Sequence, residues 1–265
     1  MTVELKTLQN LFKKIDRNYH DEREVFLDVI RLGACMVHQS SYRCLFQLPK
    51  DKVYEEVEEV RKEYVKKFSD ADLEVINDIL NYIEDHLMTH HTDILGEYYM
   101  SIGANKDVGQ FFTPFPVSYL MAQITFGSEH QETLEKQGYL SLQEPACGAG
   151  GMVLAFAKVM KDHGCEPSSQ LYVDATDIES NAFYMCYLQL SLAGISGVVR
   201  HGDTLRMEHW RHWETPSSRV MRGLGMGVYG AMSKHKTEKA DVVDQPIESE
   251  VNINLSSEGQ YGLAF

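Results

Sequence analysis

In the first hundred residues, apolar side chains recur at steps of three or four positions, which is the spacing of one face of an amphipathic helix. One such stripe consists of Val53, Val57, Val60, Tyr64 and Phe68. A second stripe consists of Leu73, Ile76, Ile79, Leu80, Ile83 and Leu87. Ser69 and Asp70 directly precede the second stripe and are suited to cap a helix. The pattern predicts a helical domain over residues 1–105, in which the stripes pack against a core rather than bind a cofactor.

The pattern changes after Gly109, where short apolar runs alternate with longer periodic ones. The runs suited to strands are residues 139–143, 171–178 and 198–203, and those suited to helices are residues 151–164 and 181–194. Short connections between alternating strands and helices indicate parallel strands in a doubly wound α/β sheet. Ligands of such sheets bind at the carboxyl ends of the strands. We therefore expect a second, ligand-binding domain over residues 106–265.

The composition is that of a globular protein without a membrane segment. Of the 265 residues, 43% are hydrophobic and 24% are charged. No run approaches the roughly 18–20 apolar residues of a membrane span, and the N-terminus lacks the apolar core of a signal peptide. The 5 cysteines include no C-x-x-C pair, so we expect reduced thiols and neither a disulfide framework nor a zinc site. These features predict a cytoplasmic protein with no membrane partner.

The net charge of −14 bears on nucleic-acid binding. A protein that binds duplex DNA unaided usually has a basic face, because contacts to the phosphates supply much of the affinity. This chain has only short basic clusters, such as Arg61-Lys62 and Lys66-Lys67. The acidic total therefore predicts that any binding to DNA needs a partner subunit.

The glycine-rich stretch EPACGAGGM, residues 144–152, lies between the first predicted strand and the helix that follows. Its glycines let the backbone turn sharply and approach a ligand, and the next helix offers free N–H groups. The dinucleotide pattern G-x-G-x-x-G fails, because Val153 stands where its third glycine would be. Glu144 before the turn suits a cationic amine better than a pyrophosphate. S-adenosylmethionine (SAM), with its ammonium and sulfonium groups, meets this description; the alternative is a plain tight turn.

Acidic residues follow the next two predicted strands. Asp177 ends the second strand, where a carboxylate accepts hydrogen bonds from ribose hydroxyls, and Glu179 is placed to share or take that role. Asp203 follows the third strand and is suited to accept a hydrogen bond from an adenine amino group. Each acid alone is as readily a helix cap or a solvated turn. Three acids in order after three strands favour a ligand that contains a nucleoside.

Four segments together resemble the SAM-binding region of N6-adenine DNA methyltransferases. They are GQFFTPFPVSYLM, EPACGAGGM, ATDIE and HGDTL, in the order of that family. The likeness is to the modification subunits of type I restriction systems above all, spans residues 90–205 and includes DILGEYYMSIG upstream. It implies a class I SAM-dependent methyltransferase fold, with a Rossmann-like sheet and an N-terminal helical domain. It also implies SAM as the cofactor and adenine in DNA as the methyl acceptor.

The resemblance assigns roles to individual residues. Those expected to close over the methionine end of the cofactor are Gln110, Phe111, Phe112, Thr113 and Pro114. Those expected to form the cofactor turn are Glu144, Ala146, Gly148 and Gly150. Asp177 would hold the ribose and Asp203 the adenine, with Ile178 and Thr204 beside them as further cofactor-binding residues. Thr113-Pro114 is also expected to interrupt the chain just before a helix that contains VSYLMAQI.

The catalytic motif of that family, N-P-P-F or a close variant, is absent from this chain. In the family, the Asn or Asp side chain and a proline carbonyl accept hydrogen bonds from the adenine amino group, while the aromatic ring stacks on the flipped base. The nearest equivalent is Asp244-Gln245-Pro246-Ile247. Asp244, the Gln245 carbonyl and Pro246 are the candidate catalytic residues, whereas Ile247 replaces the aromatic ring. We therefore expect weak or partner-dependent activity.

Two further features lie before that segment. His209 and His212 have the spacing of metal ligands, but no third ligand accompanies them, so we expect no metal site. The glycine-rich stretch RGLGMGVYGAM, residues 222–232, is expected to be a loop.

Three functions are compatible with these features. The first is a DNA adenine methyltransferase that binds DNA through a specificity or partner subunit. The second is a non-catalytic SAM-binding relative with a regulatory or anti-restriction role, which the acidity and the altered catalytic motif favour. The third is a methyltransferase of another substrate, such as protein or RNA. The sequence leaves the recognition site and the oligomeric state open.

Overall fold

The computed structural model describes residues 2–15, 21–42, 50–103 and 111–233. Its N-terminal helices are α1 (Val3–Phe12), α2 (Glu22–Ser40), α3 (Lys52–Val65), α4 (Asp70–His90) and α5 (Ile94–Ser101). Most of the described residues among the first hundred are therefore helical, as their periodicity predicts. None of the described helices is both long and apolar enough to cross a membrane.

The apolar stripe of α4 is core, and the predicted cap begins this helix. Ile76, Ile79, Ile83 and Leu87 are all fully buried. The Ser69 hydroxyl accepts a hydrogen bond from the Asp72 backbone N–H, and the Asp72 carboxylate accepts one from the Ser69 N–H. This reciprocal capping box satisfies two donors that the first turn of a helix otherwise leaves unpaired.

The second part of the chain alternates strands and helices. Its elements are α6 (Phe115–Thr125), α7 (Ser128–Gln137), β1 (Leu140–Glu144), α8 (Gly151–Asp162), α9 (Pro167–Gln170), β2 (Leu171–Asp177), α10 (Ser180–Leu192), β3 (Ser196–Asp203), β4 (Glu208–Glu214) and α11 (Pro216–Leu224). Pro114 is the N-cap of α6 and Pro116 lies in its first turn, so this helix begins where the prolines predict.

The strands form one sheet in the order β1-β2-β3-β4. β1 pairs parallel with β2, and β2 pairs parallel with β3. The parallel arrangement confirms the prediction for these three strands and brings their carboxyl ends to one edge. β4 is antiparallel to β3 and was not expected. Its sequence EHWRHWE lacks an apolar alternation, and only Trp213 of this strand is buried.

The expectation of a loop over residues 222–232 is wrong. Residues 222–224 end α11, and residues 227–233 form a further helical segment. Gly225 adopts the left-handed conformation between them, with a φ of 60°, so this glycine marks a helix end. Val228 is fully buried, and the Tyr229 hydroxyl forms a hydrogen bond with Ser218. The hydrogen bond attaches the segment to α11, which contains Ser218.

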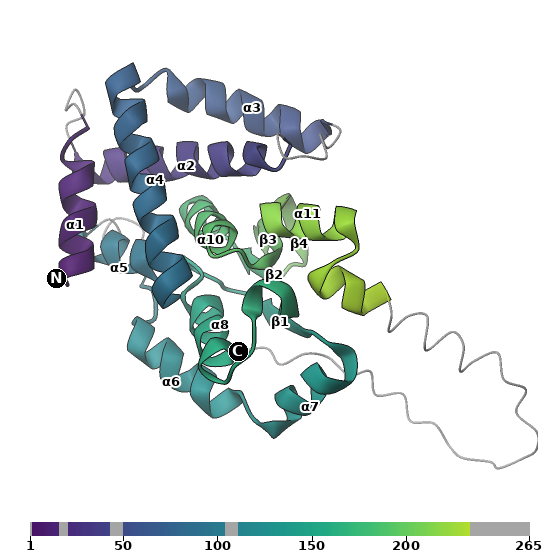
Figure 1. Ribbon diagram of the computed structural model, residues 1–265. Coiled ribbons are helices and arrows are strands. Elements are labelled where there is room, and N and C mark those ends of the chain that lie inside the picture. Colours follow the sequence, from purple (N-terminus) through teal and green to yellow (C-terminus); the bar gives the residue numbers. More distant parts are fainter. Residues whose placement is uncertain (1, 16–20, 43–49, 104–110, 234–265) are drawn as a thin grey trace, which may run out of the picture.

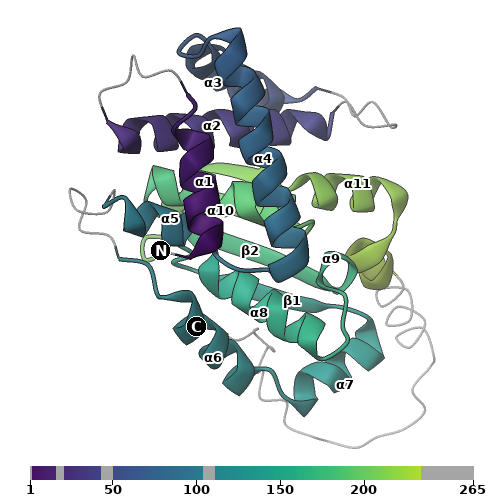
Figure 2. The ribbon, with the colours of Figure 1, turned by 60° about the vertical axis from the view of Figure 1, so that its left-hand side comes forward.

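The N-terminal helices stack on the sheet through α10 (Figure 1). α2 and α4 both pack against α10, which in turn covers β2 and β3. In the view turned by 60°, α1 and α4 cross the layer that contains α8 and the strands (Figure 2). Buried side chains from α1 to β4 form one continuous cluster. At Gly33 of α2 an added Cβ would lie 2.7 Å from Leu80 of α4, so a glycine permits this close packing.

Candidate cofactor site

The glycine loop between β1 and α8 is tightly shaped. Gly148 and Gly150 have φ values of 53° and 96°, which side chains other than glycine rarely adopt. The Gly150 N–H donates to the Cys147 carbonyl at 2.8 Å, and the Cys147 N–H donates to the Thr176 carbonyl of β2 at 2.9 Å. These bonds fold the loop across the ends of β1 and β2, where the sequence predicts the cofactor turn.

Glu144 is a buried acid at the end of β1. Only 4% of its surface is exposed, and its Oε1 accepts a hydrogen bond from the Ala146 N–H at 3.1 Å. Burial raises the pKa of this carboxyl, the hydrogen bond from Ala146 opposes that shift, and the nearby Asp177 charge adds to it. A buried carboxylate with so little compensation favours a cationic ligand beside it.

Asp177 shapes the loop as well as ending β2. Its Oδ2 accepts a hydrogen bond from the Gly148 N–H and its Oδ1 from the Glu179 N–H, each at 2.8 Å. Burial raises the pKa of Asp177, although both backbone bonds oppose the shift. Ile178, directly after it, is 58% exposed. Asp177 therefore links the glycine loop to the N-terminus of α10, a role that its position in the sequence did not reveal.

The end of β3 contacts the same loop through Thr204, which directly follows Asp203. Asp203 Oδ1 accepts hydrogen bonds from the N–H groups of Leu205 and Arg206, at 3.0 and 3.1 Å. The Thr204 hydroxyl donates to the Pro145 carbonyl at 2.7 Å. The structure thus brings the three acids predicted from the strand ends, Glu144, Asp177 and Asp203, to the carboxyl edge of one sheet.

Phe112 is partly buried against the glycine loop, whereas Phe111 is exposed. A Cβ added at Gly148 would lie 2.8 Å from Cδ1 of Phe112, and the Phe112 ring lies 5.4 Å from the Tyr99 ring. Phe111 is 75% exposed. Thr113 and Pro114 are exposed just before α6. Gln110 lies outside the described residues, as do the candidate catalytic residues Asp244, Gln245 and Pro246.

Asp93 and Gln189 support the loop from behind, and sequence reasoning gave neither a role. Gln189 Nε2 donates to Asp93 Oδ1 and to the Ala149 carbonyl, both at 2.7 Å. Its Oε1 accepts a hydrogen bond from the Leu95 N–H at 3.2 Å. Both side chains are buried. A single glutamine inside the apolar run of α10 was the available signal, since a buried amide needs partners.

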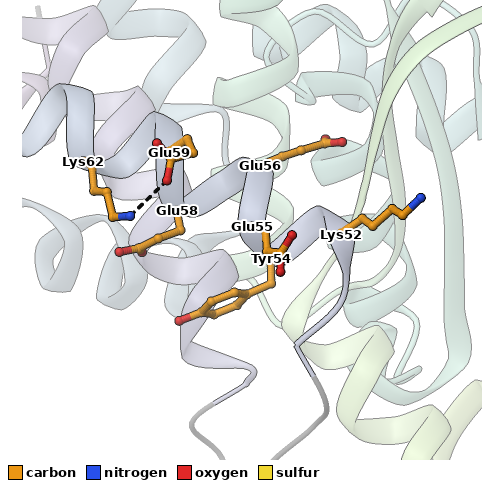
Figure 3. A pocket seen from close by; sticks show the side chains of 7 residues that line it. All are labelled: Lys52, Tyr54, Glu55, Glu56, Glu58, Glu59 and Lys62. Carbon is orange, nitrogen blue, oxygen red and sulfur yellow. Dashed lines mark hydrogen bonds and ion pairs between the residues drawn. The ribbon is translucent and has the colours of Figure 1, made fainter.

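Other polar clusters of the described residues lie elsewhere. The depression in Figure 3 is lined by side chains of α3, including Glu55, Glu56 and Glu58, and Lys62 pairs with Glu59 at 2.9 Å. All of these residues come from one helix, on the outer side of α2 (Figure 1). This acidic surface is separate from the glycine loop and adds nothing to it.

The glycine loop and the acids at the ends of β1, β2 and β3 lie at the carboxyl edge of an α/β sheet, which is where ligands of such sheets bind. The sequence matches the family described as N-6 DNA Methylase over residues 84–241, which is more than half of the chain. The chain therefore belongs to the N-6 DNA methylase family. Its described elements form an α/β fold with a mixed four-stranded sheet and helices at the N-terminus.

Individual relatives are distant. The chain is 25% identical over 224 residues to the type I restriction enzyme MpnII methylase subunit of Mycoplasma pneumoniae. That alignment covers 76% of this chain but 38% of the relative, so the chain spans well under half of the relative's length. A solved type I restriction-modification methyltransferase subunit from Streptococcus thermophilus has 13% identity and a TM-score of 0.37, covering 78% of this chain and 59% of that one.

Proposed function

We propose that this chain binds SAM at the carboxyl ends of β1, β2 and β3 and transfers its methyl group to N6 of adenine in DNA. The observation that carries the proposal is that Glu144, Asp177 and Asp203 end three adjacent parallel strands at the edge of the sheet where the glycine loop lies. In this assignment Glu144 faces the ammonium group, Asp177 the ribose hydroxyls and Asp203 the adenine amino group. When bound, SAM supplies an electrophilic methyl group on its sulfonium.

The residues present fit such a cofactor. Burial raises the pKa of both Glu144 and Asp177, so a positively charged ligand would relieve the cost of keeping these carboxylates ionised. Gly148 leaves room for the Phe112 ring to lie directly on the loop. Phe112 is thereby placed to keep water away from one side of the turn.

The methyl-transfer step is assigned to residues outside the described part of the chain. Asp244 and the Gln245 carbonyl would accept hydrogen bonds from the adenine amino group, with Pro246 fixing the backbone beside them. Ile247 offers contact area without a π face, and stacking of a base on an aromatic ring is worth about 1–3 kcal/mol. This difference supports weak activity, about tenfold to a hundredfold below that of a site with an aromatic residue.

DNA binding is proposed to occur through a specificity or partner subunit in the cytoplasm. The net charge of −14 supports this, because autonomous binding of duplex DNA relies on basic surfaces. The Mycoplasma relative is itself described as a methylase subunit. A second candidate function, a SAM-binding protein without catalysis, is favoured by the missing N-P-P-F motif.

Calorimetry with S-adenosylhomocysteine tests the cofactor assignment. Each charge-assisted hydrogen bond lost in Asp177→Ala or Asp203→Ala is expected to weaken binding by about 1.5–3 kcal/mol, or about tenfold to a hundredfold. Glu135→Ala, an exposed acid on α7, is the control and keeps the wild-type affinity. Unchanged affinity in both aspartate variants would show that the ligand binds elsewhere.

Methylation of unmethylated genomic DNA with labelled SAM then separates the functions. We expect weak labelling of DNA that rises with Ile247→Phe and disappears with Asp244→Ala. Binding without labelling, in the wild type and in Ile247→Phe, would favour the non-catalytic function. Label recovered in protein or RNA instead of DNA would identify a different acceptor.

A further inference from the structure

The pairing of β3 with β4 contains a β-bulge. His201 of β3 is paired with Arg211 of β4, but the next residue, Gly202, is paired with His209. Trp210 is therefore the extra residue of β4, without a partner in the ladder. Bulges change the direction of a side chain and are frequent beside active sites. The bulge thus determines where the Trp210 ring lies.

Trp210 is placed beside the candidate adenosine site. Its ring centroid lies 5.0 Å from that of His201, with the ring planes at 80°. His201 is the neighbour of Asp177 in the β2–β3 ladder, and its Nε2 lies 3.1 Å from the Ile178 carbonyl. Asp203 follows two residues further along β3. The indole ring is therefore next to the strand ends that carry the ribose and adenine acids.

The exposure of Trp210 sets it apart from the other tryptophan. The chain has 2 tryptophans, and Trp213 is buried in the core at 1% exposure. Trp210 is 55% exposed, so more than half of its surface is accessible to a ligand. Purine rings stack on aromatic side chains because both present a flat π surface, and tryptophan offers the largest such surface among the amino acids.

We propose that Trp210 forms an aromatic wall against which the adenine ring of the cofactor stacks. This inference rests on the proposed function, and it adds a residue that positions the nucleoside end. Asp203 would fix the adenine edge by hydrogen bonding, while Trp210 would hold its face. In the sequence Trp210 stands between His209 and Arg211, and no motif of that stretch assigned it a part in cofactor binding.

Two probes and two substitutions test the wall. S-adenosylhomocysteine contains both ends of the cofactor, whereas 5′-methylthioadenosine contains the adenosine end without the amino acid. We expect both to quench the emission of wild-type protein, and Trp210→Phe to abolish this quenching while leaving the emission of Trp213. By calorimetry, Trp210→Leu is expected to bind both probes about fivefold to a hundredfold more weakly, and Trp210→Phe within about threefold of wild type.

Met226→Ala is the matched control, because Met226 is also 55% exposed but follows α11. It is expected to bind both probes as the wild type does. Wild-type affinity of Trp210→Leu for both probes, or a loss confined to S-adenosylhomocysteine, would overturn the wall and leave the cofactor assignment standing. Failure of the wild-type protein to bind either probe would overturn the proposed function and this inference together. If Trp210→Leu does not fold, the quenching and the affinity of Trp210→Phe still test the wall, because this variant keeps an aromatic ring.

Discussion

At the scale of single residues, Gln189 connects two parts of the chain that are far apart in sequence. From α10 it reaches Asp93 and Leu95 at the start of α5 and Ala149 in the glycine loop. Burial raises the pKa of Asp93, and the hydrogen bonds from Gln189 and Gly96 partly offset that shift. The amide therefore stabilises the acid and the loop at once.

Replacing Gln189 with leucine tests this connection. Leucine is of similar volume but leaves the Leu95 N–H and the Ala149 carbonyl without their partner, at about 1–3 kcal/mol for each buried group. We expect urea denaturation to show a free energy of unfolding lower by a few kcal/mol. Gln143→Leu, at an exposed position of β1, is the control. Equal effects of the two substitutions would contradict the role of Gln189.

At the scale of elements, the β1–α8 loop depends on the left-handed backbone of Gly150 and on its closeness to α10. A Cβ at Gly150 would lie 3.3 Å from the Cys186 Sγ and 3.6 Å from the Cys186 Cα. Gly164, after α8, has a similar φ of 77°, but nothing lies within 4 Å of the corresponding Cβ. Both glycines adopt a left-handed backbone, but only Gly150 has other atoms close to the position that a Cβ would occupy.

We therefore expect Gly150→Ala to destabilise the protein more than Gly164→Ala. Both variants lose about 1–2 kcal/mol to the left-handed conformation. Only Gly150→Ala adds an overpacking cost, typically about 1–3 kcal/mol. Thermal and urea denaturation measure the difference, and calorimetry with S-adenosylhomocysteine should show weaker binding for Gly150→Ala alone. A larger loss in Gly164→Ala would show that contact with α10 is unimportant.

At the scale of the whole molecule, His38 joins the N-terminal helices to the sheet. From α2, its Nδ1 lies 3.0 Å from the Tyr187 hydroxyl of α10, and its Nε2 lies 3.3 Å from Arg219 Nη2 of α11. Its ring lies 4.9 Å from the Trp213 ring of β4. Burial lowers the pKa of His38 to about 3, and the positive charge of Arg219 contributes to the shift.

This histidine makes stability depend on pH. The unfolded chain protonates His38 below about pH 6.5, whereas the folded chain keeps it neutral down to about pH 3. The unfolded state thus binds more protons in this window, so stability falls on acidification by about 1.4 kcal/mol per pH unit from this group. We expect His38→Gln to reduce that slope in urea denaturation at pH 6.5, 5.5 and 4.5. An unchanged slope would show that another group dominates.

Much of the fold around the candidate site was predictable because it is encoded locally. The periodicities of β1, α8, β2, α10 and β3 are properties of short segments. Side chains at the ends of parallel strands meet at one edge whatever the rest of the molecule does. The sequence could therefore predict that Glu144, Asp177 and Asp203 lie at the same edge of the sheet. The two-domain division at residue 105 stays a prediction, while the core runs continuously from α1 to β4.

The amino-acid sequence by itself determined the order of these elements, the glycine loop and the family, because each is carried by neighbouring residues. Tertiary structure decided the rest. β4 has no apolar alternation and is held by pairing with β3 and by burial of Trp213. The bulge that places Trp210 exists only in that pairing. Gln189 and His38 acquire their roles from partners 40 or more residues away, and no local pattern specifies which buried polar groups will meet.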